Sequence, residues 1–192
     1  MLRRIIEALA IIMAILGGLV LTGLIAMTCL SISGRFLNDV LHSDVMAGMA
    51  WAEAALATGI GPVTGDFELI EAGMAFVIFA FLPIAQLRGS HASVDIFTSR
   101  WGVRPNRVLS LLWAVLFAAV LILIAWQLWQ GTQAKMRYGE TTYLIQLPIW
   151  WAYMAALAGA CVTALTAVYV ALARLAELLT GDTILTEAES ET

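Results

Sequence analysis

The residues best suited to catalysis or cofactor binding are few in this chain, and their spacing predicts neither. Its two histidines, His42 and His91, are 49 positions apart (91 − 42), on either side of a long apolar run. They therefore do not form the pair of ligands that holds haem inside a helix bundle. Cys29 and Cys161 occur singly inside apolar runs, which fits small core thiols better than a redox pair. We predict no catalytic residue, no metal and no cofactor in this chain.

Three carboxylates gather where an apolar run begins. Asp66, Glu68 and Glu71 precede or open the segment that starts near Leu69. Carboxylates near a helix N-terminus are stabilised by the positive end of the helix dipole, and this accounts for most of the pattern. Glu71 is the deepest of the three, and we predict that it pairs across a subunit interface.

A second polar string follows the same run. Arg88 falls at a predicted helix C-terminus, where a cation is favoured, and Gly89 follows as a stop. His91 and Asp95 are four residues apart and would share a face if the stretch is helical. Taken alone, these residues predict an interfacial turn with a helix cap.

The elements that must position these residues are four apolar spans. Such runs occur at about residues 8–32, 69–87, 108–130 and 149–173. A helix that crosses a bilayer needs about 20 mostly apolar residues. The chain has 192 residues and is 61% hydrophobic, so we predict an all-α membrane protein with one four-helix domain over residues 1–179. An acidic, disordered tail is predicted for residues 180–192.

The basic residues sort unequally between the two sides of the membrane. Seven arginines lie on the side of the termini, and three basic residues lie on the other side: Arg3, Arg4, Arg88, Arg100, Arg104, Arg107 and Arg174 against Arg35, Lys135 and Arg137. Positive charge favours the cytoplasm, so both termini are predicted to be cytoplasmic. The tryptophans at the end of the third span and the start of the fourth, Trp126, Trp129, Trp150 and Trp151, then form an aromatic belt at the outer interface.

The first outer loop, about residues 33–68, is long enough to contain a short helix. Ser43 or Asp44 would cap this helix and Gly59 would end it. The sequence leaves two placements open, an interfacial helix on the outer leaflet or a loop helix packed on the bundle.

Small residues recur every four positions in the fourth span, at Ala155, Gly159, Thr163 and Ala167. In lipid, such a row lets helix backbones approach closely. We favour packing within the chain's own bundle over a seam between subunits. The third span carries bulky residues instead, which suits contact with lipid or with a larger partner.

Two of these strings together resemble a known family. The first comprises Arg88, Gly89, His91, Val94, Asp95 and Ile96; the second runs from Thr141-Thr142 through Leu144, Leu147-Pro148-Ile149-Trp150 and Tyr153. They resemble the small membrane subunit (DctQ-like) of tripartite ATP-independent periplasmic (TRAP) transporters. The resemblance extends over about residues 5–178 and includes the number and spacing of the spans.

The resemblance implies a role in a secondary importer of the bacterial inner membrane. In such a system a periplasmic protein captures a solute, often an organic acid, and a large multi-span subunit moves it, usually with sodium. This chain would scaffold the large subunit, and sodium coupling would belong to that partner. The candidate interface or structural residues are Glu71, Arg88, His91, Asp95, Thr142, Pro148 and Trp150.

Two other functions remain open from the sequence. A free-standing small transporter or channel would need polar groups at membrane depth, where the chain offers only threonines such as Thr22 and Thr163. A small membrane enzyme could place its site in the cytoplasmic loop with Arg88, His91 and Asp95. The sequence does not identify the transported solute or the stoichiometry.

Overall fold

The computed structural model describes residues 2–43, 46, 49–88 and 103–180, and in these residues the chain is all-α. It forms the helices α1 (Leu2–Leu41), α2 (Ala50–Ala57), α3 (Asp66–Leu87), α4 (Val103–Tyr138) and α5 (Ile149–Thr180). Four of them, all except α2, are long and apolar enough to cross a membrane. The predicted all-α fold and the number of long apolar helices that could span a membrane are confirmed.

The long helices continue beyond the apolar runs that predict them. The predicted outer loop begins at Ser33, but α1 continues to Leu41, so this boundary is wrong. Hydropathy drops there because Arg35, Asn38 and Asp39 appear, whereas no proline interrupts the backbone hydrogen bonds of the helix. At about 1.5 Å per residue, the 40 residues of α1 span about 60 Å. That length is about twice the hydrocarbon thickness of a bilayer.

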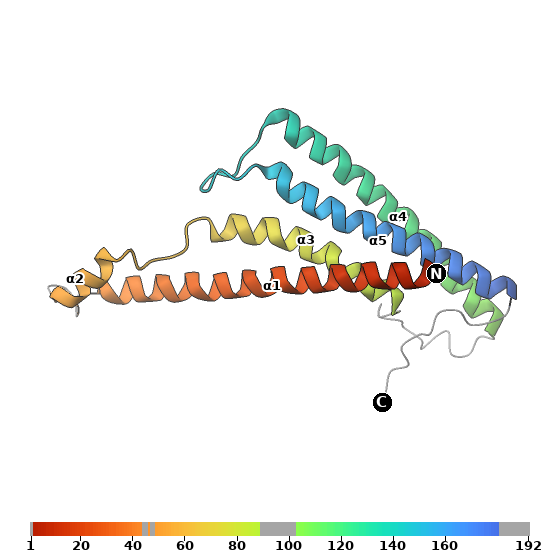
Figure 1. Ribbon diagram of the computed structural model, residues 1–192, viewed down its shortest axis with the longest axis horizontal. Coiled ribbons are helices and arrows are strands. Elements are labelled where there is room, and N and C mark those ends of the chain that lie inside the picture. The colour runs from red at the N-terminus through yellow and green to blue at the C-terminus, as the bar shows by residue number, and fades with distance from the viewer. Residues whose placement is uncertain (1, 44–45, 47–48, 89–102, 181–192) are drawn as a thin grey trace.

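The four long helices pack in the order α1, α3, α5, α4, with little contact between α1 and α5. Figure 1 shows that the α1–α3 pair and the α5–α4 pair diverge toward the end that carries α2 and the α4–α5 loop. We call this the loop end. The opposite end, where α1 starts and α5 stops, is the terminal end. The molecule is therefore a splayed row of helices.

Small residues set the spacing within this row. A Cβ atom on Gly17 would lie 2.7 Å from the Cβ of Ala80, so α1 and α3 approach closely there. Between α4 and α5 the buried cluster consists of Ala118, Leu121, Ala164 and Ala167. Close approach without a driving hydrophobic effect is how helices associate in lipid.

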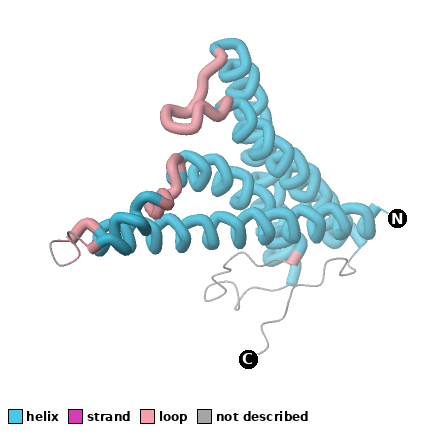
Figure 2. The backbone as a smooth tube through the Cα atoms, turned by 60° about the vertical axis from the view of Figure 1, so that its left-hand side comes forward, coloured by secondary structure: helices cyan, strands magenta, loops and turns pink. Residues whose placement is uncertain are grey.

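The short helix between α1 and α3 lies beside the last turns of α1 (Figure 2). It starts after Met49, which makes no side-chain cap, so the predicted cap at Ser43 is wrong, and Asp44, the alternative cap, lies outside the described residues. The hydroxyl of Ser43 donates to the carbonyl of Val40 instead, 2.6 Å away. Gly59, with φ of +82°, follows the end of the helix as predicted. Ala52 is buried, whereas Trp51 is 57% exposed.

Candidate functional site

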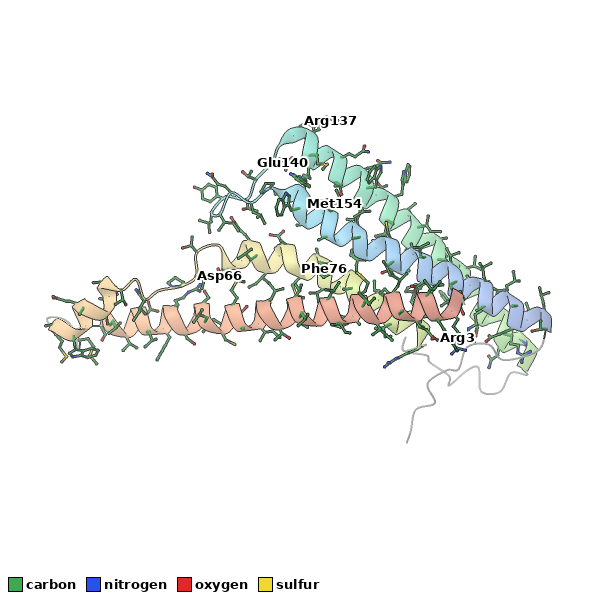
Figure 3. All side chains as sticks on the ribbon, in the orientation of Figure 1. Arg3, Asp66, Phe76, Arg137, Glu140 and Met154 are labelled. Carbon is green, nitrogen blue, oxygen red and sulfur yellow. The ribbon has the colours of Figure 1, made fainter. Side chains whose placement is uncertain are left out.

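At the loop end, Asp66 joins the start of α3 to α1. The hydroxyl of Ser31, on α1, donates to Asp66 Oδ2 at 2.6 Å, and the backbone N–H of Phe67 donates to Oδ1 at 2.8 Å. Arg35 lies 3.7 Å from the same carboxylate. Ser31 is fully buried and also accepts the N–H of Val63. Asp66 is therefore a structural anchor between α1, α3 and the segment that joins them (Figure 3).

Two residues further along, Glu68 joins α3 to the opposite side of the molecule. Its two carboxylate oxygens accept the backbone N–H groups of Leu144 and Ile145, at 2.7 Å and 3.1 Å. Both donors belong to the α4–α5 loop. Gly65 makes room for this contact, because a Cβ atom there would lie 2.4 Å from Ile145 Cγ2. Glu68 thus spans the two diverging helix pairs at the loop end.

The α4–α5 loop folds through its own hydrogen bonds. The N–H of Thr142 donates to the carbonyl of Leu147, and the Thr142 hydroxyl accepts the N–H of Leu147 at 3.0 Å. Pro148 forms an isolated β-bridge with Thr141. Thr142 and Pro148 therefore shape the loop that presents its backbone N–H groups to Glu68.

The aromatic residues predicted for an interface lie at the same end. Trp150 and Trp151 open α5 and pack edge to face, with ring centroids 5.7 Å apart. Trp151, Trp126 and Trp129 are each about half exposed. Their position suits the boundary between lipid and water, where amphipathic rings concentrate.

The small residues of α5 lie against two neighbours within the chain. A Cβ atom on Gly159 would lie 2.8 Å from the Cβ of Phe79, on α3. The Thr163 hydroxyl is 3.0 Å from the carbonyl of Phe79, besides a bond to its own helix. Ala167 belongs to the cluster shared with α4, and Ala155 is half-buried.

The remaining candidates are exposed or outside the described residues. Glu71 lies on an outward stripe of α3 together with Phe67, Met74 and Ile78, all exposed. Arg88 is exposed, and its backbone N–H closes the last turn of α3 on Ile84. His91 and Asp95 lie outside the described residues.

The described part of the chain contains no group of three or more histidine, cysteine, aspartate or glutamate residues that could hold a metal ion. Charged residues of the long helices lie within about two turns of a helix end. The surface between these ends is apolar, most of all on α1 and α4. This arrangement suits contact with lipid and with other membrane helices.

Comparison with protein families decides what kind of membrane protein this is. The family model described as "Tripartite ATP-independent periplasmic transporters, DctQ component" matches residues 24–180. This chain belongs to that family. The match covers well over half of the 192 residues and confirms the resemblance found in the sequence. No curated protein and no solved structure matches the chain significantly.

A DctQ component is a multi-pass membrane subunit of a TRAP transporter, which confirms that the chain is not an enzyme. Membership also implies a complex with the other TRAP components. In this DctQ component, the contacts of Ser31 and Glu68 are the polar features that sequence reasoning missed. Asp66 and Glu68 were identified in the sequence, but the sequence indicated only that carboxylates are favoured at a helix N-terminus. Their partners come from residues 35 positions away (66 − 31) and 76 positions away (144 − 68).

Proposed function

We propose that this DctQ component scaffolds the large transport subunit of its TRAP system and takes no part in binding the solute. The observation that carries the proposal is the exposed apolar surface of four long helices whose charges lie near the helix ends. A solute or ion pathway needs polar or charged groups at membrane depth. Threonine hydroxyls within the spans bond to backbone carbonyls of this chain, as Thr22 does to Gly18 and Thr163 to Phe79.

The loop end supports a scaffold that holds a fixed shape. Asp66 joins α3 to α1, and Glu68 joins α3 to the α4–α5 loop. The Glu68 contact spans the two helix pairs where they diverge, and the Asp66 contact holds α1 and α3 together at the same end. A scaffold for a moving partner needs such fixed spacing.

The orientation, partners and transport chemistry belong to the same proposal. Both termini lie in the cytoplasm, by the distribution of basic residues, and the membrane is the bacterial inner membrane. The partners are the large multi-span subunit and a periplasmic solute-binding protein. The solute is an organic acid or a similar compound, and coupling to sodium resides in the large subunit.

Reconstitution into proteoliposomes tests the division of labour. The large subunit and the binding protein are combined with and without this chain, and solute uptake is measured under a sodium gradient. We expect uptake only with all three proteins, and none with this chain and the binding protein alone. Uptake by this chain without the large subunit would instead establish a free-standing transporter.

A further inference from the structure

Pro83 leaves one backbone carbonyl of α3 without its usual partner. In a helix each carbonyl accepts the N–H of the residue four positions later, and a proline has no N–H to donate. The carbonyl affected is that of Phe79. Phe79 lies 13 residues into α3 (79 − 66), about 20 Å from its start. In a helix that spans a membrane, water is not present at this depth to pair with the carbonyl.

The missing donor comes from α5. The Thr163 hydroxyl lies 3.0 Å from the carbonyl oxygen of Phe79, and Thr163 is fully buried. The same hydroxyl lies 2.8 Å from the carbonyl of Gly159, in its own helix, and it has one hydrogen to donate. In α5 the Gly159 carbonyl also accepts a backbone N–H from four residues later. The Phe79 carbonyl has no such N–H, so it gains more from the hydroxyl.

A glycine on α5 lets the two helices come close enough for this bond. A Cβ atom on Gly159 would lie 2.8 Å from the Cβ of Phe79 and 3.3 Å from its carbonyl carbon. Gly159 lies about one turn before Thr163 on α5, as Phe79 lies about one turn before Pro83 on α3. Three residue types therefore meet at one carbonyl: a proline that lacks an N–H, a glycine that lacks a Cβ, and a threonine that donates.

We propose that the hydrogen bond from the Thr163 hydroxyl to the Phe79 carbonyl sets the angle between the two helix pairs. The pairs meet chiefly through α3 and α5, and they diverge from there toward the loop end (Figure 1). Lipid tails are as apolar as the packed side chains, so apolar packing alone defines this angle weakly. A hydrogen bond requires its donor close to one particular carbonyl and therefore selects one arrangement. The inference concerns the fold of this chain and does not rest on the scaffold role.

A double-mutant cycle between Thr163 and Pro83 tests the bond. Thr163→Val keeps the shape of the side chain but removes the hydroxyl, and we expect the midpoint of thermal unfolding in detergent to fall by about 2–4 °C. In the background of Pro83→Ala, which gives the Phe79 carbonyl a backbone N–H, the same substitution should cost less. Thr166→Val is the control, because Thr166 is also fully buried on α5 but its hydroxyl donates to Val162 within the helix. An equal fall for Thr163→Val in both backgrounds would contradict the proposal.

The angle between the pairs is measured separately with two spin labels at the loop end. Asp39→Cys on α1 and Arg137→Cys on α4 are exposed positions on different pairs, in a background without the two native cysteines. We expect double electron–electron resonance to give a broader distribution of label distances in Thr163→Val than in the labelled parent. Thr163→Ser, which retains a hydroxyl, and Thr166→Val should keep the parent distribution. An unchanged distribution in Thr163→Val would overturn the proposal, since other contacts would then hold the angle.

Discussion

Asp66 and Glu68 are only two residues apart, yet they face different parts of the molecule. Asp66 bonds to Ser31 on α1, and Glu68 bonds to the loop between α4 and α5. Glu71, one turn deeper, is exposed and makes no such bond within the described residues. Three carboxylates on one helix start therefore divide into two that hold the chain together and one that is available to a partner.

The carboxylate of Glu68 should contribute to the stability of the isolated chain. Glu68→Gln keeps the size of the side chain but loses its charge and one acceptor oxygen. We expect the temperature of unfolding to fall, because the hydrogen bonds from the N–H groups of Leu144 and Ile145 are stronger to a charged acceptor than to a neutral amide. Thermal unfolding in detergent, followed by circular dichroism, measures it. Glu71→Gln is the control, and an equal loss in both variants would contradict this assignment.

Glu71 and Arg88 should matter to the complex and not to the choice of solute. We expect Glu71→Ala and Arg88→Ala to reduce the amount of large subunit that copurifies, and the uptake rate with it. Competition between solutes in whole-cell uptake measures preference separately. A changed order of preference in either variant would argue against a scaffold role.

At the scale of the helices, close contacts at glycine residues determine how α3 packs against α1 and α5. Gly159 allows α5 to touch the side chain and backbone of Phe79 on α3, and Gly17 does the same for α1 against Ala80. The alignment of α3 between its neighbours depends on these points. Gly23, by contrast, has no atom within 4 Å of the place where its Cβ would be.

The same substitution at two glycines separates packing from helix propensity. Gly159→Ala should lower the free energy of unfolding by about 1–3 kcal/mol, because an added methyl group must displace Phe79. Gly23→Ala should be neutral or stabilising, since alanine favours helix and meets open space. Both are measured by thermal unfolding in the same detergent. Similar stability changes in the two variants would show that the contact at Gly159 is not tight.

Sequence patterns predicted the helices better than their ends. Apolar runs identify the parts that cross the bilayer, but α1 continues nine residues past position 32 (41 − 32). Backbone hydrogen bonds form in a helix whether its side chains are polar or apolar, so hydropathy does not mark where the helix ends. The contacts of Asp66 with Ser31 and of Glu68 with the α4–α5 loop were not predictable either. A single sequence does not show which distant hydroxyl or backbone N–H groups will donate to a carboxylate. The row of small residues in α5 was visible because it is local and periodic.

At the scale of the whole molecule, the proposed orientation in the membrane can be tested by labelling introduced cysteines. We expect Ile5→Cys and Leu185→Cys, each in a background without Cys29 and Cys161, to react with an impermeant maleimide only after the cells are opened. Tyr143→Cys, in the α4–α5 loop, is the opposite control and should react in intact cells, since Tyr143 is 91% exposed. Labelling of either terminal cysteine from outside would overturn the proposed topology.

The splayed arrangement of the helix pairs affects how much apolar surface the molecule exposes. Two helix pairs that diverge toward the loop end expose more apolar surface than a closed bundle of the same helices would. Part of that surface can meet lipid, since lipid tails are as apolar as the exposed side chains. The rest gives a broad flank on which a larger membrane subunit can pack.

Purification of the chain from its native membranes in mild detergent, with mass spectrometry of every retained protein, tests the scaffold role most directly. We predict one large multi-span membrane protein in a fixed stoichiometric ratio to this chain, retained through washing. Recovery of the chain alone, as a defined oligomer that carries solute across a bilayer, would contradict the account.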